Sequence, residues 1–420
     1  MIRRLYTLLF YAALPLVFLR LLWRSRRNPA YRMRWRERLG YCNVGLPTGA
    51  IWIHAVSVGE SQAAEPLIRQ LQTDFPERTL LVTTTTPTGA DHVAKLFGDA
   101  VIHCYFPLDL PFAVRRFLDQ AKPAMLLMME TEIWPNLLGE CASRGVPTLL
   151  ANARLSAKSA RGYSRLGSFA RAVFAGIDHV AAQSEEDAER FRALGVPPER
   201  VAITGSLKFD VRLPASLFEQ AEVIRRGFGH RPVWIAASTR DGEEEPILKA
   251  HRRILRAIPG ALLLLVPRHP ERFNNVAQLC KRQGFSLVRR SDREACAPRT
   301  EIYLGDSMGE MSLLLAASDV AFFGGSLMKF GGHNFLEAAA MGMPVTFGPH
   351  MFNFATISRM FLEQGAAVEI DSAESLASIM IRWLNNAGER SRVGEKGRTL
   401  VARNKGAREK LMALVTRMLR

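Results

Sequence analysis

A regular alternation of short apolar runs with amphipathic stretches, from Ile51 onward, constrains the fold of this chain most strongly. Such alternation is typical of βαβ units, which build a mostly parallel sheet with helices on both faces. The first run, Ile51 to Ile53 followed by Ala55 and Val56, has the unbroken hydrophobicity of a strand covered on both faces. The sequence therefore predicts an α/β fold of the doubly wound type.

The expected strands fall into two groups, separated by an irregular stretch at 205–214. The first group is expected near 51–56, 80–84, 101–105, 124–128, 148–151, 179–182 and 201–204. The second is expected near 233–237, 261–266, 286–288, 301–303, 319–322 and 344–347. Helices are expected at 60–72, 111–120, 185–194, 216–226, 373–384, 391–402 and 405–419. Because 420 residues exceed one ordinary domain, we predict an N-terminal segment (1–40) and two domains (41–210 and 211–420).

The N-terminal segment has the composition of a membrane anchor. Residues 5–19 carry no charge, and Leu21, Leu22 and Trp23 extend the apolar stretch to near the lower length limit of a spanning helix. No small-residue cleavage site follows, which favours a retained anchor over a signal peptide. The helix either spans the membrane or lies in its interface, kinked by Pro15. A flank of arginines places the rest of the chain on the cytoplasmic side: Arg24, Arg26, Arg27, Arg32, Arg34, Arg36 and Arg38.

Charge and cysteine usage narrow the class of partner and the compartment. The formal net charge of +16 indicates an anionic partner, either nucleic acid, an acidic membrane surface or a phosphorylated substrate. The five cysteines are scattered and contain no CxxC pair, so they predict neither a disulfide framework nor a zinc site and fit a reducing cytosol. No DxD-type metal motif is present, and Glu243 to Glu245 resemble the acidic first turn of a helix.

Glu60 lies on the turn between the first strand and the next helix, where ligands collect in an open α/β sheet. It is a candidate general base. Ser57 and Glu60 also have the spacing of a helix capping box, and the two interpretations do not exclude each other.

Further candidates follow later strands. Glu130 and Glu132 come after the fourth expected strand and point the same way, so they either share one site with raised pKa values or charge the first turn of a helix. Lys208, beside the domain boundary, either holds an anionic group or is a surface lysine.

In the second domain, strand-end loops present groups that suit a phosphate. Arg268 and His269 follow one strand and Arg240 another, although a buried, hydrogen-bonded role fits His269 equally well. The glycine pairs 324–325 and 331–332 would let backbone amides approach a phosphate, with a helix opening at His333 or Asn334 and Glu337 on its first turn. The spacing fits neither a Walker A loop nor GxGxxG.

Taken together and in order, these motifs resemble those of 3-deoxy-D-manno-octulosonic acid (Kdo) transferases, the family that adds Kdo to lipid A precursors. The likeness covers essentially the whole chain. It rests on the segments SVGE, METEIWPN, GSLKFD, VPRHPER and GGSLMKFGGHNFLEAAAMGMPV.

The resemblance implies a GT-B glycosyltransferase with two Rossmann-like domains, which binds the acceptor on the first and the nucleotide-sugar on the second. It implies inverting transfer of Kdo from CMP-Kdo to the lipid A precursor (lipid IVA) in lipopolysaccharide biosynthesis, at the cytoplasmic side of the inner membrane, without a metal or other cofactor. Glu60 would be the base, and Glu130 and Lys208 would stabilise the transition state. The residues that would hold CMP are Arg268, His269, Met308, Gly309, Glu310, Asn334, Phe335, Leu336 and Glu337.

Two other functions fit parts of the sequence. One is a GT-B relative that uses a UDP-sugar, either a lipid glycosyltransferase or a nucleotide-sugar epimerase. The other is a basic membrane-surface adaptor or nucleic-acid binder. Nucleic acid is the less favoured partner, because the interleaved aromatic and basic residues of base-stacking surfaces are missing.

Overall fold

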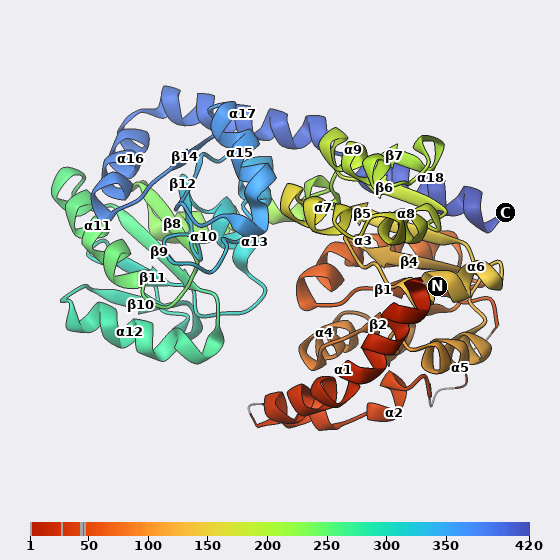
Figure 1. Ribbon diagram of the computed structural model, residues 1–420. Helices are drawn as coiled ribbons and strands as arrows, with labels where there is room; N and C mark the ends of the chain where they lie inside the picture. The colour runs from red at the N-terminus through yellow and green to blue at the C-terminus, as the bar shows by residue number, and fades with distance from the viewer. Residues whose placement is uncertain (1, 27, 43–44, 46–47) are drawn as a thin grey trace. The chain divides into compact units, whose positions relative to one another are not determined.

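The computed structural model describes residues 2–26, 28–42, 45 and 48–420 of the chain. These residues form two compact units (Figure 1). The first contains residues 1–210 together with 405–420, and the second contains 211–404. Residues 405–420, which the sequence assigned to the second domain, therefore pack in the first.

The strands of the first unit form a parallel seven-stranded sheet in the order β3-β2-β1-β4-β5-β6-β7. The strand order reverses beside β1, so that β1 lies between β2 and β4. All four residues of β1 are fully buried, as expected for a strand with helices on both faces. The strands are β1 (Ile51–His54), β2 (Leu80–Thr84), β3 (Ile102–Tyr105), β4 (Met125–Met129), β5 (Thr148–Ala153), β6 (His179–Ala182) and β7 (Val201–Ile203).

Helices connect and cover these strands. The α-helices are α1 (Ile2–Ser25), α2 (Trp35–Arg38), α3 (Val58–Asp74), α4 (Pro87–Phe97), α5 (Pro111–Ala121), α6 (Pro135–Ser143), α7 (Ala157–Ser164), α8 (Ser168–Ala175), α9 (Glu185–Ala193) and α18 (Ala407–Leu419). The 3-10 turns are η1 (Pro29–Arg32), η2 (Gly98–Ala100), η3 (Pro198–Arg200) and η4 (Leu207–Phe209).

The second unit repeats this architecture, with a parallel sheet in the order β10-β11-β9-β8-β12-β13-β14. Its strands are β8 (Val233–Thr239), β9 (Leu262–Pro267), β10 (Leu287–Arg289), β11 (Ile302–Leu304), β12 (Val320–Phe323), β13 (Val345–Phe347) and β14 (Ala367–Glu369). Its helices are α10 (Ser216–Phe228), α11 (Glu244–Ala257), α12 (Phe273–Arg282), α13 (Met311–Ala316), α14 (Leu336–Ala340), α15 (Ala355–Glu363), α16 (Ala373–Asn385) and α17 (Ala387–Asn404), with the turns η5 (Pro270–Arg272), η6 (Arg290–Asp292) and η7 (Phe352–Phe354).

The doubly wound α/β prediction is confirmed, and two details of it are wrong. The edge strand β14 was not expected, and the helix placed at His333 or Asn334 begins at Leu336 instead. Asn334 caps this helix, because its Oδ1 atom accepts the amide of Leu336 at 3.0 Å.

Helix α18 is held in the first unit by polar and apolar contacts. The Asp210 carboxylate accepts the amides of Gly406 and Arg408 at 2.7 and 2.6 Å, at the point where the chain re-enters the unit. Leu411 and Val415 are buried in the same apolar cluster as Leu67 of α3. The α3 helix thus owes part of its cover to the segment after the second unit (Figure 1).

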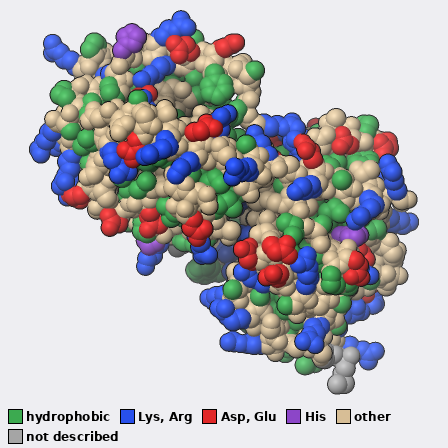
Figure 2. Space-filling model, turned by 90° about the horizontal axis from the view of Figure 1, so that it is seen from above, with side chains coloured by type: hydrophobic (Ala, Val, Ile, Leu, Met, Phe, Trp, Pro, Cys, Tyr) green, Lys and Arg blue, Asp and Glu red, His purple; other side chains and the backbone are tan. Residues whose placement is uncertain are grey.

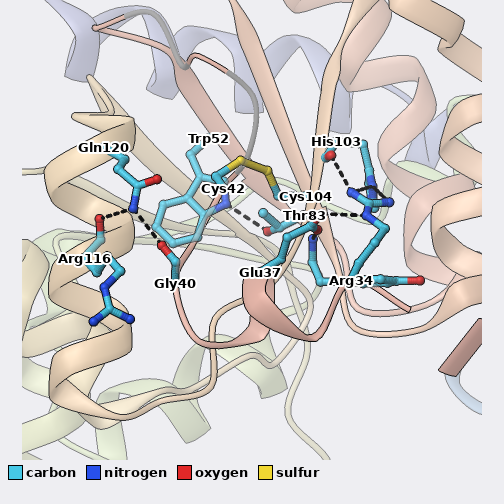
Figure 3. The surroundings of a disulfide bond; sticks show 11 residues. Arg34, Glu37, Gly40, Cys42, Trp52, Thr83, His103, Cys104, Arg116 and Gln120 are labelled. Atoms are coloured by element: carbon cyan, nitrogen blue, oxygen red, sulfur yellow. Dashed lines mark hydrogen bonds and ion pairs between the residues drawn. A yellow bond between two sulfur atoms is a disulfide. The ribbon is translucent and has the colours of Figure 1, made fainter. Parts of the chain in front are cut away.

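Two cysteines form a disulfide, which corrects the expectation drawn from their scattered positions. Cys42 and Cys104 are 62 residues apart, and their Cα atoms are separated by 6.4 Å (Figure 3). The bond joins the segment before β1 to β3, close to Trp52, whose Nε1 donates to Thr83 Oγ1 at 2.8 Å. Both cysteines are buried, so the bond is shielded from bulk thiols.

This pairing predicts a thiol count. Three cysteines, Cys141, Cys280 and Cys296, are free in the described part of the chain, out of five in the sequence. Protein denatured without reductant should therefore titrate three thiols with a chromogenic disulfide reagent, and five after reduction. The Cys42→Ser variant should give the same count before and after reduction, because Cys104 loses its partner. Five thiols in unreduced wild-type protein would contradict the bond.

Basic side chains are spread widely over the surface, whereas strongly apolar sequence is concentrated near the N-terminus. Lys and Arg side chains are scattered over the face seen in Figure 2, with acidic groups between them. Among the described residues, only the helix segment 3–25 is long and apolar enough to cross a membrane, judged by length and composition alone.

Candidate active site

Glu60 lies in the first turn of α3, directly after β1. Its Oε2 atom accepts the amide of Val56 at 2.9 Å, and its Oε1 atom accepts the Ser57 hydroxyl at 3.3 Å. The Ser57 side chain does not cap the helix amides, so the reciprocal capping box is not formed. Glu60 therefore fixes the turn through one backbone bond while its carboxylate stays at the carboxyl end of the sheet.

The surroundings of Glu60 favour its protonated form. Burial is the main cause, and the negative charges of Glu132 and Glu130 add to it, so that the pKa of Glu60 rises to about 7. Hydrogen bonds from Val56 and Ser57 oppose the shift but do not cancel it. A carboxylate with a pKa near the working pH suits general base catalysis, because it can both accept and release a proton.

The two glutamates after β4 have different partners. Glu130, with a positive φ of 56°, forms an ion pair with Arg154 at 2.9 Å. Glu132 accepts the indole N–H of Trp134 at 2.9 Å and lies 3.8 Å from Nε2 of the buried His54. That nitrogen has no hydrogen-bond partner among the described residues. Glu130 thus belongs to a network with Arg154, whereas Glu132 lies beside the rings of Trp134 and His54.

Lys208 occupies the turn η4, just after β7, and interacts with the same network. The turn is anchored by Asn152, whose Oδ1 atom accepts the Leu207 amide at 3.0 Å. Burial lowers the pKa of Lys208, the negative charge of Glu130 raises it, and Arg154 lowers it again. Electrostatic coupling thus links Glu130 both to Glu60 and to Lys208, and the structure brings together the three residues predicted as catalytic.

In the second unit, two arginines and two histidines, Arg240, Arg268, His269 and His333, gather near the carboxyl ends of β8 and β9. Arg240 contacts Nε2 of His269, and its guanidinium lies 4.5 Å from the ring centre of Phe330. His333 lies beside them: burial, followed by Arg268, Arg240 and His269, lowers its pKa to about 4. Burial and then Arg240 also lower the pKa of His269. The positive charge of Arg240 and Arg268, which disfavours protonation of both histidines, favours an anionic ligand.

The first glycine pair is braced by a buried carboxylate and does not present open amides. Glu243 Oε2 accepts the amides of Arg240 and Gly325 at 2.8 and 2.6 Å, and Oε1 accepts those of Ser326 and Leu327, both at 2.9 Å. The expectation that this pair offers its amides to phosphate is therefore wrong for these positions. Gly325 is required for another reason, because a Cβ atom there would lie 2.9 Å from the His333 ring.

The remaining predicted nucleotide residues differ in what they can offer a ligand. Glu310 is held by Arg290 through two contacts of 2.8 and 3.1 Å, whereas Met308 is exposed. Gly309, between them, has a φ of +83° and shapes the turn. Their role in binding CMP stays a prediction.

Residues 334–337, at the start of α14, are partly buried in the core. The side chains of Phe335 and Leu336 are fully buried, so only their backbone is available to a ligand. Glu337 accepts the Ser312 hydroxyl at 2.6 Å, and Asn334 is exposed. Among the described residues, no group of three or more His, Cys, Asp or Glu side chains is arranged to hold a metal ion.

Sequence reasoning missed two residues that this geometry brings into the site. Arg154 follows β5 and pairs with Glu130, and the rule that selected the other strand-end residues would also have selected it. Glu243 was interpreted only as part of an acidic helix turn, because its amide partners at Gly325 and Ser326 lie more than 80 residues away.

Comparison with known proteins gives consistent results along the chain. Residues 33–211 match the family described as 3-deoxy-D-manno-octulosonic-acid transferase (kdotransferase), and residues 286–400 match glycosyl transferases group 1. The chain is 45% identical to the 3-deoxy-D-manno-octulosonic acid transferase of Haemophilus influenzae, over 98% of this chain and 97% of the relative. It is 38% identical to that of Bordetella pertussis, over 96% of each chain.

Solved structures share the fold at much lower identity. The UDP-GlcNAc 2-epimerase from Neisseria meningitidis bound to UDP-GlcNAc has a TM-score of 0.59 and 12% identity, covering 88% of this chain and all of that one. A glycosyltransferase from Rickettsia africae has a TM-score of 0.58 and 14% identity, covering 89% of this chain and 99% of that one. At this level of identity, these likenesses concern the fold alone.

Proposed function

Because the chain belongs to the Kdo transferase family, we propose that it moves Kdo from CMP-Kdo to a lipid A precursor, with Glu60 as the general base. The chain is a glycosyltransferase of Kdo, and its two parallel α/β units have the GT-B architecture. Beyond this family activity, we propose the identity of the acceptor, the inverting stereochemistry and the roles of the residues.

The observation that carries this mechanism is the environment of Glu60. Its carboxylate lies at the carboxyl end of β1, has a pKa of about 7 and is coupled to Glu130, which is coupled in turn to Lys208. A base is needed because the acceptor is a sugar hydroxyl, which becomes a good nucleophile only as its proton leaves.

In the proposed step, an acceptor oxygen attacks the anomeric carbon of Kdo from the face opposite the phosphate. The bond from that carbon to the CMP phosphate oxygen breaks, CMP leaves as an anion, and the hydroxyl proton passes to Glu60. Lys208, whose charged form is favoured by the negative charge of Glu130, stabilises the negative charge that develops in the transition state. In this scheme, cationic side chains supply the positive charge at the reacting centre.

We place the donor in the second unit, where the strand-end loops carry Arg240, Arg268, His269 and His333. Guanidinium groups bind phosphate and carboxylate through paired hydrogen bonds. CMP-Kdo carries both anions. The predicted contacts of Met308, Gly309, Glu310, Asn334, Phe335, Leu336 and Glu337 with the nucleotide belong to this proposal.

The proposed acceptor also accounts for the N-terminal segment and the net charge. A lipid A precursor is a phosphorylated glycolipid embedded in the inner membrane, so an anchored enzyme with a net charge of +16 meets it at an anionic surface. We therefore place both units on the cytoplasmic side, with residues 2–25 as the membrane contact. Nucleic acid has no role in this scheme.

The raised pKa of Glu60 predicts a pH profile. A base acts in its deprotonated form, so kcat/KM for the acceptor should fall as the pH drops through about 7 and level off above it. The Glu132→Gln variant should move the inflection to lower pH, because it removes a negative charge that raises the pKa of Glu60. Glu65→Gln is the matched control, since Glu65 lies on the same helix but pairs with Arg69 at 2.9 Å. An inflection unmoved by Glu132→Gln would contradict this electrostatic account.

The reaction itself is tested by incubating purified protein with lipid IVA and CMP-Kdo and weighing the product by mass spectrometry. Addition of one or more Kdo units supports the proposal and also gives the number transferred. Turnover of UDP-sugars with CMP-Kdo left untouched would favour the UDP-sugar alternative. The structural likeness to UDP-N-acetylglucosamine 2-epimerases does not support that alternative, because at 12–14% identity it concerns fold alone.

A further inference from the structure

Helix α1 has two faces along its whole length. One face is partly buried against the first unit and recurs with helical spacing. The opposite face is exposed over the same length. The partly buried residues are Tyr6, Thr7, Phe10, Ala13, Leu14, Val17, Phe18, Leu21 and Arg24.

The buried face is docked at both ends of the helix. Near the N-terminal end, the Tyr6 hydroxyl donates to the buried Asp109 at 3.0 Å, and Thr7 donates to Asn136 at 3.0 Å. Near the C-terminal end, the rings of Phe18 and Trp35 lie 5.1 Å apart. In Figure 1, α1 accordingly runs alongside the first unit.

While α1 keeps these contacts, it cannot also span a bilayer. Tyr6 and Phe18 are separated along the helix axis by about 18 Å, more than half of a hydrocarbon core about 30 Å thick. A membrane across α1 would therefore enclose the part of the first unit that contacts it. Asp109, which also accepts the amides of Asn136 and Leu137, would be drawn into hydrocarbon at a large cost in free energy.

The exposed face has the composition of a membrane contact. Most of its side chains are large and apolar, with Arg3, Arg4 and Arg20 exposed among them, and exposed apolar groups of neighbouring segments accompany them. No acidic residue occurs before Glu37, whereas ten arginines occur in residues 1–38. Such a surface complements an anionic bilayer, with apolar side chains in the acyl boundary and arginines among the headgroups. The exposed apolar residues are Leu5, Leu8, Leu9, Tyr11, Leu16, Leu19, Leu22 and Trp23 of α1, with Met33, Phe112 and Leu166.

We propose that α1 lies in the plane of the membrane, docked on the first unit, with its exposed face in an anionic lipid surface. The helix then forms the membrane-binding side of the first unit, and it does not cross the bilayer. This inference rests on the membrane location proposed above and is independent of the transfer reaction, so the two can fail separately.

Topology gives the first test. A short tag with a single cysteine ahead of Met1, on the full chain, is exposed to a membrane-impermeant maleimide in spheroplasts and in inverted inner-membrane vesicles. An in-plane helix keeps the tag in the cytoplasm, so labelling should occur only in the inverted vesicles. Labelling in intact spheroplasts would show a spanning helix and overturn the proposal. Untagged protein measures the background from the native cysteines.

Vesicle binding gives the second test. Leu8→Glu, Leu16→Glu and Leu19→Glu combined, in the full-length protein, should abolish flotation with vesicles that contain phosphatidylglycerol. Phe218→Glu with Val223→Glu is the matched control, because these exposed apolar residues lie on α10 of the second unit. The control should float like wild type and retain its melting temperature. Unchanged flotation of the α1 variant, or equal loss in the control, would contradict the assigned surface.

If the wild-type protein does not float with the vesicles, both the proposed membrane location and the in-plane helix are contradicted. Kdo transfer in detergent solution would be unaffected by that outcome. Conversely, correct topology and flotation in a protein that transfers no Kdo would leave the membrane inference standing and remove the proposed reaction.

Discussion

Replacing Glu60 with glutamine should reduce turnover of CMP-Kdo by about 10²- to 10⁴-fold, the usual contribution of a general base. The substituted side chain keeps an oxygen for the amide of Val56, so the turn should persist. Binding of CMP, measured by calorimetry, should be unchanged, because the proposed donor residues lie in the second unit. Near-wild-type turnover would leave Glu60 with a structural role only.

Stability separates a catalytic effect from misfolding in the same variant. Folding raises the pKa of Glu60 to about 7, so the folded state binds a proton more tightly than the unfolded state. The ionised carboxylate therefore disfavours folding, with a penalty that grows as pH rises from the unfolded pKa to about 7 and is complete above it. At pH 8, Glu60→Gln should melt at the same temperature as wild type or higher, and a lower melting temperature would point to damage. Glu65→Gln, which removes the half-exposed ion-pair partner of Arg69 on the same helix, should change neither turnover nor melting.

Removal of the Glu243 carboxylate should strongly reduce the stability of the second unit. Four backbone amides donate to it, and the side chain is fully buried. Glu243→Ala leaves these amides without their acceptor, with an expected loss in unfolding free energy on the order of 3–5 kcal/mol. The loop that carries Gly325 should loosen as a result, and CMP affinity should fall.

The milder Glu243→Gln variant keeps the prediction testable if the alanine variant does not fold. It retains one acceptor oxygen but turns an amide group towards two N–H donors, so its melting temperature and CMP affinity should lie between those of wild type and alanine. Glu245→Gln is the matched control, because Glu245 is exposed on the same turn. Wild-type CMP affinity in folded Glu243→Gln protein would show that the brace does not serve the donor site.

The sequence was a good guide to the fold wherever the signal was local. Buried parallel strands are nearly continuous apolar runs, so thirteen of the described strands lie close to their expected positions. The strand β14 was missed because it is three residues long, lies at the sheet edge and carries Glu369. Periodicity also located the last helix but could not assign it to a unit. The apolar face of α18 shows that the helix packs on a sheet, but it does not show which sheet.

The same limit applies to the site. Strand-end position selected Glu60, Glu130 and Lys208, because carboxyl ends of parallel strands meet at one edge. Contacts between residues distant in the chain carry no local signal. The acidic run at Glu243 looks the same whether it faces solvent or binds a loop more than 80 residues away, and Cys42 shows no spacing relation to Cys104.

The route of the chain through the two units sets an order of assembly during translation. All seven strands of the first sheet precede Asp210, but α18 follows the entire second unit. A ribosome must therefore synthesise most of the protein between the strand that leads to Glu60 and the helix that completes the cover of α3. The strand and turn that carry Glu60 are synthesised early, whereas α3 gains its cover from α18 only after the second unit has emerged.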